Sequence, residues 1–246
     1  MILKEISSAN NPLLKQIAQV RRDPTRERFF IEGTRFVEEL PPECVLEVFT
    51  TDPEKHAEFL SSLPETVTGY RLSEGAMKKI CAAVSPQTIA CTVRRNETTR
   101  PDKLVILDRV QDPGNVGTVI RTAYAFGFGV ILLPGCANPW SAKTLMSTAG
   151  AFRACHIEQA SDGEMLFEQL KKDGFSVFAT ALDPSAVPPE ELNFGEKRAI
   201  VIGSEGQGIS PHLLKAATKT VYIPMSNPIN SLNAASAASI MIYALR

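Results

Sequence analysis

Three segments of the chain combine small, amide, carboxylate and guanidinium residues in spacings that suit ligand binding. The first spans residues 108–123 and contains Asp112-Pro113-Gly114-Asn115, followed six positions later by Arg121. A guanidinium and an amide that face one loop suit a phosphate or hydroxyl oxygen. Asn115 occupies an expected helix N-cap position. The segment therefore predicts either an oxygen-binding site or, without any function, a turn and a capped helix.

The second segment, Gly203-Ser204-Glu205-Gly206-Gln207-Gly208, directly follows an apolar run. Its glycines allow the backbone to approach a ligand closely. The spacing is not Gly-x-Gly-x-x-Gly, and it lacks the Lys-Ser/Thr of a phosphate-binding loop, which disfavours dinucleotide and nucleoside-triphosphate binding. Glu205 is the candidate functional carboxylate.

The third segment runs from Ile223-Pro224-Met225 through Ser231-Leu232-Asn233 into the small residues 234–238. Small residues permit close helix packing, and this explanation of residues 234–238 is favoured over direct ligand contact. Ser231 and Asn233 are the functional candidates.

Alternating strands and helices are expected to position these segments. We expect strands at 104–108, 130–134, 176–181, 199–203 and 220–224 and helices at 117–126, 142–149, 164–172, 211–216 and 231–245. This alternation predicts an α/β fold with a mostly parallel sheet and helices on both faces. Ligands of such sheets bind beyond the carboxyl ends of the strands, where the three segments lie.

The N-terminal part predicts a separate small α/β domain. We expect helices at 11–21, 54–63 and 73–82 and strands at 45–50 and 88–93. The polar stretch Thr92–Lys103 is typical of a linker. The predicted domains are therefore residues 1–99 and 100–246.

Composition and charge restrict the class of protein. Apolar residues make up 44% of the chain and charged residues 22%, which is typical of a globular protein. No apolar run approaches the roughly 20 residues of a membrane span, and the N-terminus does not resemble a signal peptide. Five cysteines without a Cys-x-x-Cys pair and three scattered histidines predict free thiols and no metal site. We expect a cytoplasmic protein.

The three segments, in this order, resemble the motifs of the SpoU (TrmH-like) branch of the SPOUT RNA methyltransferases over roughly residues 104–246. The first family motif, Asp-x-Pro-x-Asn-x-Gly-x-x-x-Arg-Thr-Ala, corresponds to residues 112–123, with one residue fewer between Asp112 and Asn115. The second corresponds to residues 203–208 and the third to residues 223–225 and 231–238. The resemblance implies functional roles for Asn115, Arg121 and Glu205.

The same resemblance implies a trefoil knot that binds S-adenosylmethionine, and a homodimer with each active site near the interface. It places Gly203, Ile223 and Leu232 at cofactor positions, largely through their backbone, with Thr180 or Ala179 as a weaker candidate. Pattern arguments alone would have predicted an ordinary doubly wound sheet, because knots are nearly absent among folds.

The N-terminal part is similar to the substrate-binding domain of this family, through residues 10–15 and 29–35. This similarity implies a small α/β domain, related to RNA-binding ribosomal proteins, that binds RNA. The net charge is −1, so an RNA site must depend on a local basic cluster. The candidates are Arg21, Arg22, Arg26, Arg28 and Arg35. A solvated charged loop is the alternative explanation.

The implied activity is methyl transfer to a ribose 2′-hydroxyl of ribosomal RNA, of the large subunit in the first place, or of transfer RNA. A guanidinium is a poor proton acceptor, so Arg121 is expected to stabilise the developing alkoxide or a phosphate. Asn115, Ser231 and Asn233 would shape the pocket, and Glu205 would orient Arg121. The alternatives are a catalytically silent RNA-binding protein and a nicotinamide-dependent oxidoreductase, which the missing glycine fingerprint disfavours.

Overall fold

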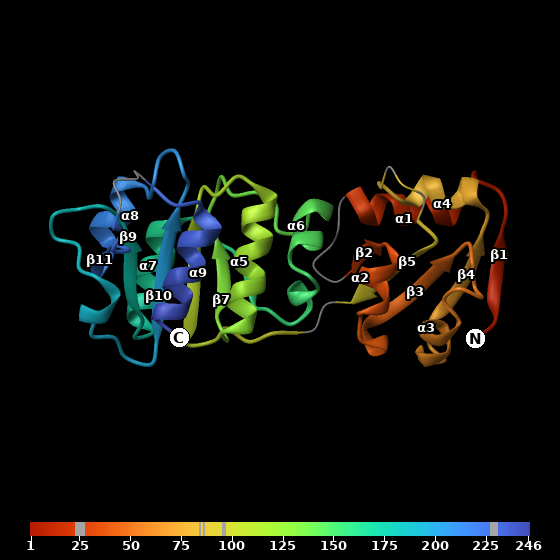
Figure 1. Ribbon diagram of the computed structural model, residues 1–246, viewed down its shortest axis with the longest axis horizontal. Coiled ribbons are helices and arrows are strands. Elements are labelled where there is room, and N and C mark those ends of the chain that lie inside the picture. The colour runs from red at the N-terminus through yellow and green to blue at the C-terminus, as the bar shows by residue number, and fades with distance from the viewer. Residues whose placement is uncertain (23–27, 84, 86, 95–96, 227–230) are drawn as a thin grey trace. The chain divides into compact units, whose positions relative to one another are not determined.

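The computed structural model describes residues 1–22, 28–83, 85, 87–94, 97–226 and 231–246. Its contacts divide the chain into two compact units (Figure 1). The first contains residues 1–97 and 140–142, and the second contains residues 98–139 and 143–246. The sequence had placed the boundary after residue 99 and had not assigned residues 140–142 to the first unit. There the ring of Trp140 lies 5.2 Å from that of Phe29, and both residues are buried.

The first unit is built on a mixed sheet with the strand order β1-β4-β3-β5-β2. Strands β1 and β3 are parallel to β4, whereas β5 is antiparallel to both β3 and β2. Its core contains Leu14, Ile17, Phe30, Phe49 and Met77. The strands are β1 (Leu3–Ile6), β2 (Arg28–Glu32), β3 (Val45–Thr50), β4 (Thr68–Leu72) and β5 (Ile89–Arg94), and the helices are α1 (Pro12–Arg22), α2 (Thr34–Glu38), α3 (Ala57–Ser62) and α4 (Glu74–Ile80).

Several elements of this unit differ from the prediction. β1, β2, β4 and α2 were not predicted, because each has only four or five residues and is stabilised by pairing or packing with distant parts of the chain. The predicted linker was too long at both ends. Thr92 is fully buried within β5, between β2 and β3, and Lys103 begins the next strand. The strand predicted at 88–93 is thereby confirmed as β5, and it overlaps the first residues of the predicted linker because Thr92 and Val93, although followed by polar residues, pair with both neighbouring strands.

The second unit contains an all-parallel sheet of six described strands in the order β11-β9-β10-β6-β7-β8. The predicted parallel α/β architecture is therefore confirmed. β8 was missed because it has only three residues, and the last strand ends before the predicted Pro224. The strands are β6 (Lys103–Asp108), β7 (Gly129–Leu132), β8 (Ile157–Gln159), β9 (Ser176–Thr180), β10 (Arg198–Gly203) and β11 (Lys219–Val221).

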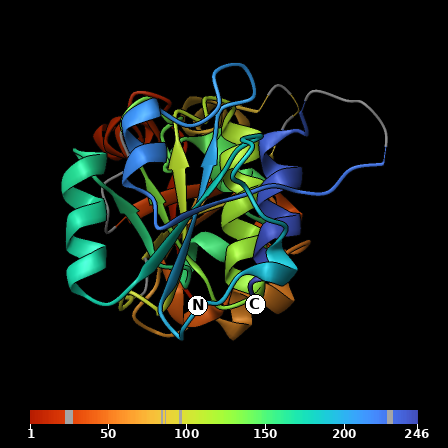
Figure 2. The same cartoon turned by 90° about the vertical axis from the view of Figure 1, so that its left-hand side faces the viewer.

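Helices cover both faces of this sheet, as Figure 2 shows for the pair α5 and α9 on one face and the pair α7 and α8 on the other. The helices are α5 (Pro113–Ala125), α6 (Ala142–Ser147), α7 (Gly163–Lys172), α8 (Pro211–Ala216) and α9 (Ala234–Ala244). The last helix begins three residues later than predicted, because Asn233 is its N-cap. Of the helices that the structure describes, none is both long and apolar enough to cross a membrane.

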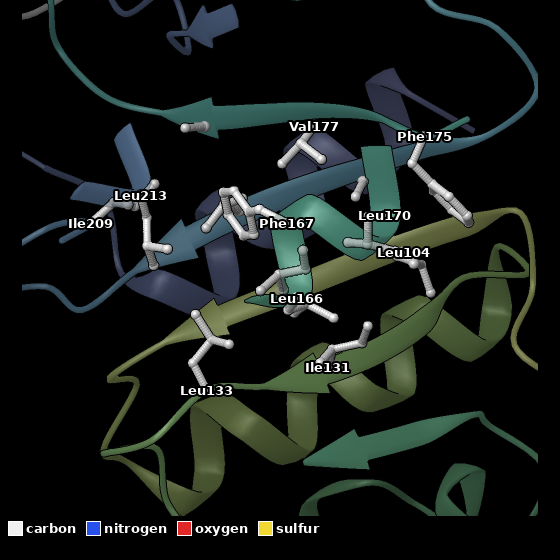
Figure 3. Packing of buried hydrophobic residues seen from close by; sticks show 14 residues of the cluster. Leu104, Ile131, Leu133, Leu166, Phe167, Leu170, Phe175, Val177, Ile209 and Leu213 are labelled. Carbon is white, nitrogen blue, oxygen red and sulfur yellow. The ribbon is translucent and has the colours of Figure 1, made fainter. Parts of the chain in front are cut away.

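Apolar side chains between α7 and the sheet form a hydrophobic cluster (Figure 3). Leu166, Phe167 and Leu170 of α7 lie over Leu104 and Ile131 of the sheet. Burial of each such side chain contributes roughly 1.5–3 kcal/mol. This packing fixes the strands whose carboxyl ends carry the three polar segments.

Candidate functional site

The three polar segments meet at the carboxyl edge of the parallel sheet. The first follows β6, the second follows β10, and the third links β11 to α9. β6 and β10 are neighbours, with Gly203 paired to Asp108 at their ends. Because parallel strands end at the same edge, segments about 90 residues apart in the chain become adjacent.

Asp112, rather than Asn115 as predicted, is the N-cap of α5. Its carboxylate accepts hydrogen bonds from the backbone N–H groups of Gly114 (2.6 Å) and Asn115 (3.1 Å). These bonds, and then Lys143 at 3.6 Å, hold the pKa of Asp112 below its usual value. The prediction failed because helix formation can start at Pro113, which is well tolerated in a first helical turn. The side chain of Asn115 is thereby free for another contact.

Asn115, Glu205 and Asn233 form a hydrogen-bonded cluster. Asn115 donates from Nδ2 to Glu205 Oε1 (2.6 Å), and Asn233 donates from Nδ2 to Asn115 Oδ1 (3.0 Å) and to Glu205 Oε1 (3.5 Å). The backbone N–H of Ala234 also donates to Glu205 Oε1 (3.3 Å). One carboxylate oxygen thus connects all three segments.

Asn233 also fixes the start of α9. Its Oδ1 accepts from the backbone N–H groups of Ala235 (2.9 Å) and Ser236 (3.2 Å), as an N-cap does. The carboxylate of Glu205 therefore lies at a helix N-terminus, where the helix dipole favours a negative charge. Small residues behind the cap, including Ala234 and Ala238, are buried. Their burial fits the packing explanation that the sequence favoured.

A pocket of about 360 Å³ lies beside this cluster. Its size falls within the usual range of ligand sites, about 300–1,000 Å³. All four predicted cofactor residues line it, and so do two predicted catalytic residues. These are Thr180, Gly203, Ile223 and Leu232, together with Glu205 and Ser231. Most of the remaining lining is apolar, including Ile202, Leu214 and Val221.

Gly203 is required by the shape of the pocket wall. A Cβ at this position would lie 2.2 Å from the backbone carbon of Gly208 and 2.5 Å from its oxygen. The second segment therefore folds back onto the end of β10. Gly208 has a φ of 63°, which a residue with a side chain rarely adopts. Gly203 makes room for the turn that forms this wall, and Gly208 supplies its left-handed backbone conformation.

Arg121 is not part of the cluster. It lies six residues after Asn115, which corresponds to roughly 120° around the helix and about 9 Å along it. Its side chain is exposed and forms no hydrogen bond or ion pair with any residue that the structure describes. Thr122, in contrast, faces α9 and lies 3.3 Å from Ser239 between the hydroxyl oxygens. Within this chain, then, Glu205 does not orient Arg121 as the sequence had predicted.

The predicted RNA-binding arginines are in different situations. Arg21 and Arg22 end α1, where Arg22 is exposed. Arg28 is ion-paired with Glu47 of β3, and Arg35 is paired with Glu39 at 3.3 Å. Arg26 lies outside the described residues. Of the four described arginines, Arg28 is the least suited to a phosphate, because its ion pair with Glu47 is partly buried, whereas the pair of Arg35 with Glu39 is exposed.

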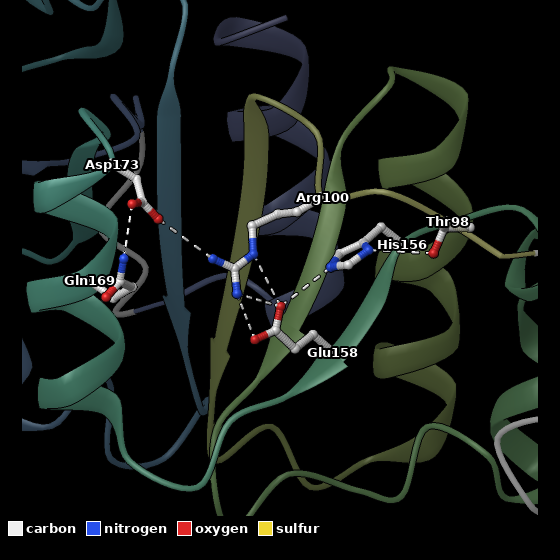
Figure 4. Close-up of polar contacts among 6 residues, drawn as sticks. All are labelled: Thr98, Arg100, His156, Glu158, Gln169 and Asp173. Carbon is white, nitrogen blue, oxygen red and sulfur yellow. Dashed lines mark hydrogen bonds and ion pairs between the residues drawn. The ribbon is translucent and has the colours of Figure 1, made fainter.

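A second polar network lies at the amino ends of the strands (Figure 4). Arg100 donates to both oxygens of Glu158 at 2.7 and 2.8 Å and lies 4.0 Å from Asp173. His156 Nε2 is 3.3 Å from Glu158, and its Nδ1 is 3.4 Å from Thr98. The hydrogen bond with His156 and then Arg100 lower the pKa of Glu158 to about 2. The groups of this network satisfy one another.

Sequence reasoning missed Asp108 and Arg109 at the end of β6. Asp108 is a buried carboxylate whose Oδ2 accepts from the backbone N–H and the hydroxyl of Ser210. Arg109 has a φ of 57° and donates to Gln207 and Gly208 of the second segment. A charged pair at the end of an apolar strand could have been noticed, but the backbone conformation and the partners could not.

Comparisons with known proteins find similar sequences and a similar fold. The family model of the SpoU rRNA Methylase family matches residues 102–243. The 23S rRNA (guanosine(2553)-2′-O)-methyltransferase RlmP of Bacillus subtilis is 33% identical over 99% of this chain and 100% of its own. The 23S rRNA (guanosine-2′-O-)-methyltransferase RlmB of Acinetobacter baylyi is 29% identical over 83% of this chain and 90% of its own. An AdoMet-bound rRNA methyltransferase from Sinorhizobium meliloti has a similar structure, with a TM-score of 0.78, 28% identity and coverage of 98% and 97%.

Proposed function

The chain belongs to the SpoU rRNA methylase family, and from this premise we infer that it methylates a ribose 2′-hydroxyl of RNA with S-adenosylmethionine. The observation that carries this inference is the pocket at the carboxyl edge, with the Asn115, Glu205 and Asn233 cluster at its side. The relatives from Bacillus subtilis and Acinetobacter baylyi are both named as 23S rRNA methyltransferases, so large-subunit ribosomal RNA is the proposed substrate. A cytoplasmic location follows from this substrate.

The residues of the pocket fit S-adenosylmethionine. Apolar walls at Ile202, Leu214 and Val221 suit a nucleoside base, and the missing Cβ of Gly203 leaves its backbone accessible. Glu205 is the one charged residue among the described residues that line the pocket, and a carboxylate complements a cationic ligand. When bound, the cofactor supplies an activated methyl group on a positively charged sulfur.

The protein must align the hydroxyl and stabilise its oxygen during proton loss, because a ribose 2′-hydroxyl is a poor nucleophile. The cluster supplies rigid alignment, since Glu205 fixes the amide of Asn115 and the start of α9. Asn115 and Asn233 can direct an amide toward the ribose. Ser231 lies in the pocket lining and adds a hydroxyl. The proposed role of Arg121 is to stabilise the developing alkoxide or a neighbouring phosphate.

Arg121 can perform this role in the active site of a second copy of the chain. It is exposed on the outer side of α5, about 120° around the helix from Asn115. Large apolar side chains are also exposed on α5, α6 and α9, namely Tyr124, Met146, Ile240 and Tyr243. Exposed apolar surface favours association. We therefore propose a homodimer in which each subunit contributes Arg121 to the site of the other.

A mixing experiment tests this arrangement. Arg121→Ala and Asn233→Ala variants, each nearly inactive alone, should regain activity when their subunits are exchanged, since one of the two sites in a mixed dimer is intact. Sedimentation should show a dimer for each variant. If the mixed dimers form but recover no activity, Arg121 acts in the active site of its own subunit.

The proposed trefoil knot is supported by the path of the third segment. β11 lies beside β9 at one edge of the sheet, whereas α9 packs on α5 and β10. From the described parts of the connection, residues 222–226 and 231–233, Ile223 and Leu232 line the pocket. A threaded connection would hold both residues against the loop that follows Gly203.

We propose that the first unit binds the RNA substrate through phosphate interactions of Arg21, Arg22, Arg26 and Arg35. Removal of each arginine–phosphate interaction should reduce the slope of log affinity against log salt by roughly 0.7–0.9. Arg28→Ala should change this slope less than Arg22→Ala, because Arg28 is already paired with Glu47. If replacing all these arginines leaves the slope of log affinity against log salt unchanged, the arginines do not contact RNA phosphates and belong to a solvated charged loop.

The activity itself is tested by methyl transfer to RNA. The purified protein with labelled S-adenosylmethionine should methylate large-subunit RNA, and nuclease mapping should locate the label on one ribose. RNA from a strain that lacks the protein should be the better acceptor. Tight RNA binding without cofactor binding or methyl transfer would instead favour a catalytically silent RNA-binding protein.

A further inference from the structure

Arg109 adopts a backbone conformation that is unusual for a residue with a side chain. It directly follows β6 and has a φ of 57°, in the left-handed region. Such positions cost free energy, persist only where the surrounding structure holds them, and cluster at functional sites. The side chain packs on Gly135, where a Cβ would lie 3.0 Å from Arg109 Cγ. The guanidinium is thus held in a fixed direction.

The guanidinium of Arg109 joins the first segment to the second. Its Nη1 donates to Gln207 Oε1 (2.6 Å), its Nη2 to the backbone oxygen of Gly208 (3.2 Å), and its Nε to Asp108 Oδ1 (3.2 Å). Asp108 in turn accepts at Oδ2 from the backbone N–H (2.7 Å) and hydroxyl (2.8 Å) of Ser210. Two adjacent residues therefore hold the second segment at positions 207, 208 and 210.

This segment carries Glu205 and one wall of the pocket. Gly208, Ile209 and Gln207 line the pocket, and Glu205 accepts the bonds that align Asn115 and the start of α9. Between positions 204 and 208 the internal support is limited to an isolated β-bridge of Ser204 with Gly208, which includes the bond from Gly208 N to Ser204 O, and a bond from Gln207 N to Ser204 Oγ. A Cβ at Gly206 would contact nothing within 4 Å. The loop therefore depends on external contacts for a fixed position.

We propose that Arg109 is a positioning residue that holds residues 204–208 so that Glu205 meets Asn115 and the pocket wall stays formed. The proposal rests on the proposed function, since it assigns Arg109 to the same active site. Arg109 acts through Gln207 and Gly208 rather than by touching the substrate. The competing explanation is that Arg109 only neutralises the buried carboxylate of Asp108.

Two substitutions separate these explanations. Arg109→Lys keeps a positive charge beside Asp108, but one ammonium cannot reproduce the planar fork that serves Gln207 and Gly208. Gln207→Met removes the acceptor and leaves the pair of Asp108 and Arg109 intact. Each variant should speed hydrogen exchange of the 204–208 amides, weaken S-adenosylmethionine binding and lower the single-turnover rate at saturating cofactor by on the order of tenfold to a hundredfold.

The double variant measures the coupling of the two residues. If Arg109 acts through Gln207, the double variant should be no worse than the more impaired single variant, because both remove the same hydrogen bond. Arg100→Lys is the matched control, since Arg100 is also paired with a carboxylate, Glu158, but at the other edge of the sheet. It should leave loop exchange, cofactor affinity and turnover within about twofold of the wild type.

The results that would overturn the role of Arg109 differ from those that would overturn the proposed methyltransferase activity. Wild-type loop exchange and cofactor affinity in Arg109→Lys, or strictly additive losses in the double variant, would overturn the proposal. Unchanged loop exchange, affinity and turnover in both Arg109→Lys and Gln207→Met would assign Arg109 to charge compensation alone, because both variants keep a positive charge beside Asp108. If the wild type methylates no RNA, the proposed function fails, and loop exchange and cofactor affinity still decide the role of Arg109.

Discussion

The two ends of the second unit's sheet carry similar polar groups in different surroundings. At the amino end, Arg100, His156 and Glu158 satisfy one another (Figure 4). At the carboxyl end, Asn115, Glu205 and Asn233 lie at the starts of α5 and α9, beside a pocket. Both ends contain arginine–carboxylate pairs, so pairing alone does not identify a functional site.

The orientation of the elements makes the difference. In a parallel α/β sheet every helix starts at the carboxyl edge, so unpaired backbone N–H groups and helix dipoles converge there. Loops at that edge also adopt strained or glycine-dependent conformations, as Arg109 and Gly208 do. Among the residues that the structure describes, the amino end has no comparable convergence of backbone N–H donors. A polar network there stabilises the fold, whereas one at the carboxyl edge can bind a ligand.

The largest effect is expected at Arg121. Arg121→Ala should lower the single-turnover methylation rate by about 10²–10³ and leave cofactor affinity nearly unchanged, because the charge acts mainly in the transition state. Arg121→Lys should restore little of the rate. Single-turnover assays beside calorimetry would check this. A near-normal rate, or a defect confined to cofactor binding, would refute the role of Arg121.

An intermediate effect is expected at Glu205. Glu205→Gln replaces a charge-assisted acceptor by a neutral one, which weakens its bonds with Asn115 and Ala234 by about 1 kcal/mol and should slow turnover about tenfold. Glu164→Gln is the control, because this exposed carboxylate lies at the same edge but outside the cluster. If both substitutions slow the single-turnover rate equally, Glu205 contributes through the electrostatic potential at this edge and not through its hydrogen bonds.

The smallest effect on catalysis is expected at the amino end. Glu158→Gln should leave turnover unchanged and lower stability by roughly 1 kcal/mol, a shift of about 2–4 °C in Tm for a chain of this size. The pKa of Glu158 is lowered from 4.5 to about 2, so its stabilising contribution is present above pH 4.5 and disappears as the pH falls through about 2. The stability difference between wild type and variant should therefore shrink over this interval in acid titrations of unfolding. A constant difference would contradict the pairing, and slower turnover would give the amino end a role in catalysis.

The sequence by itself determined the parallel α/β architecture of the second unit and the segments that form its site. Apolar runs such as Leu104–Leu107 predict buried strands because both faces of a central parallel strand are covered. The resemblance of the three motifs to the SpoU family implied cofactor positions at Gly203, Ile223 and Leu232, and these residues line one pocket. Local composition was sufficient for the buried strands and the glycine-rich turns, because these depend mainly on neighbouring residues, whereas the roles of the pocket residues came from the family resemblance.

The tertiary structure decided which atoms meet. Asp112 rather than Asn115 caps α5, which frees the amide of Asn115 for a carboxylate 90 residues away. Arg121 lies apart from Glu205, and Arg28 is neutralised by Glu47 of another strand. The conformation of Arg109 and its contacts with Gln207 and Gly208 depend on the pairing of β6 with β10. Hydrogen bonds between residues far apart in the chain form only after the sheet has aligned its strands, and no local pattern of residues encodes that alignment.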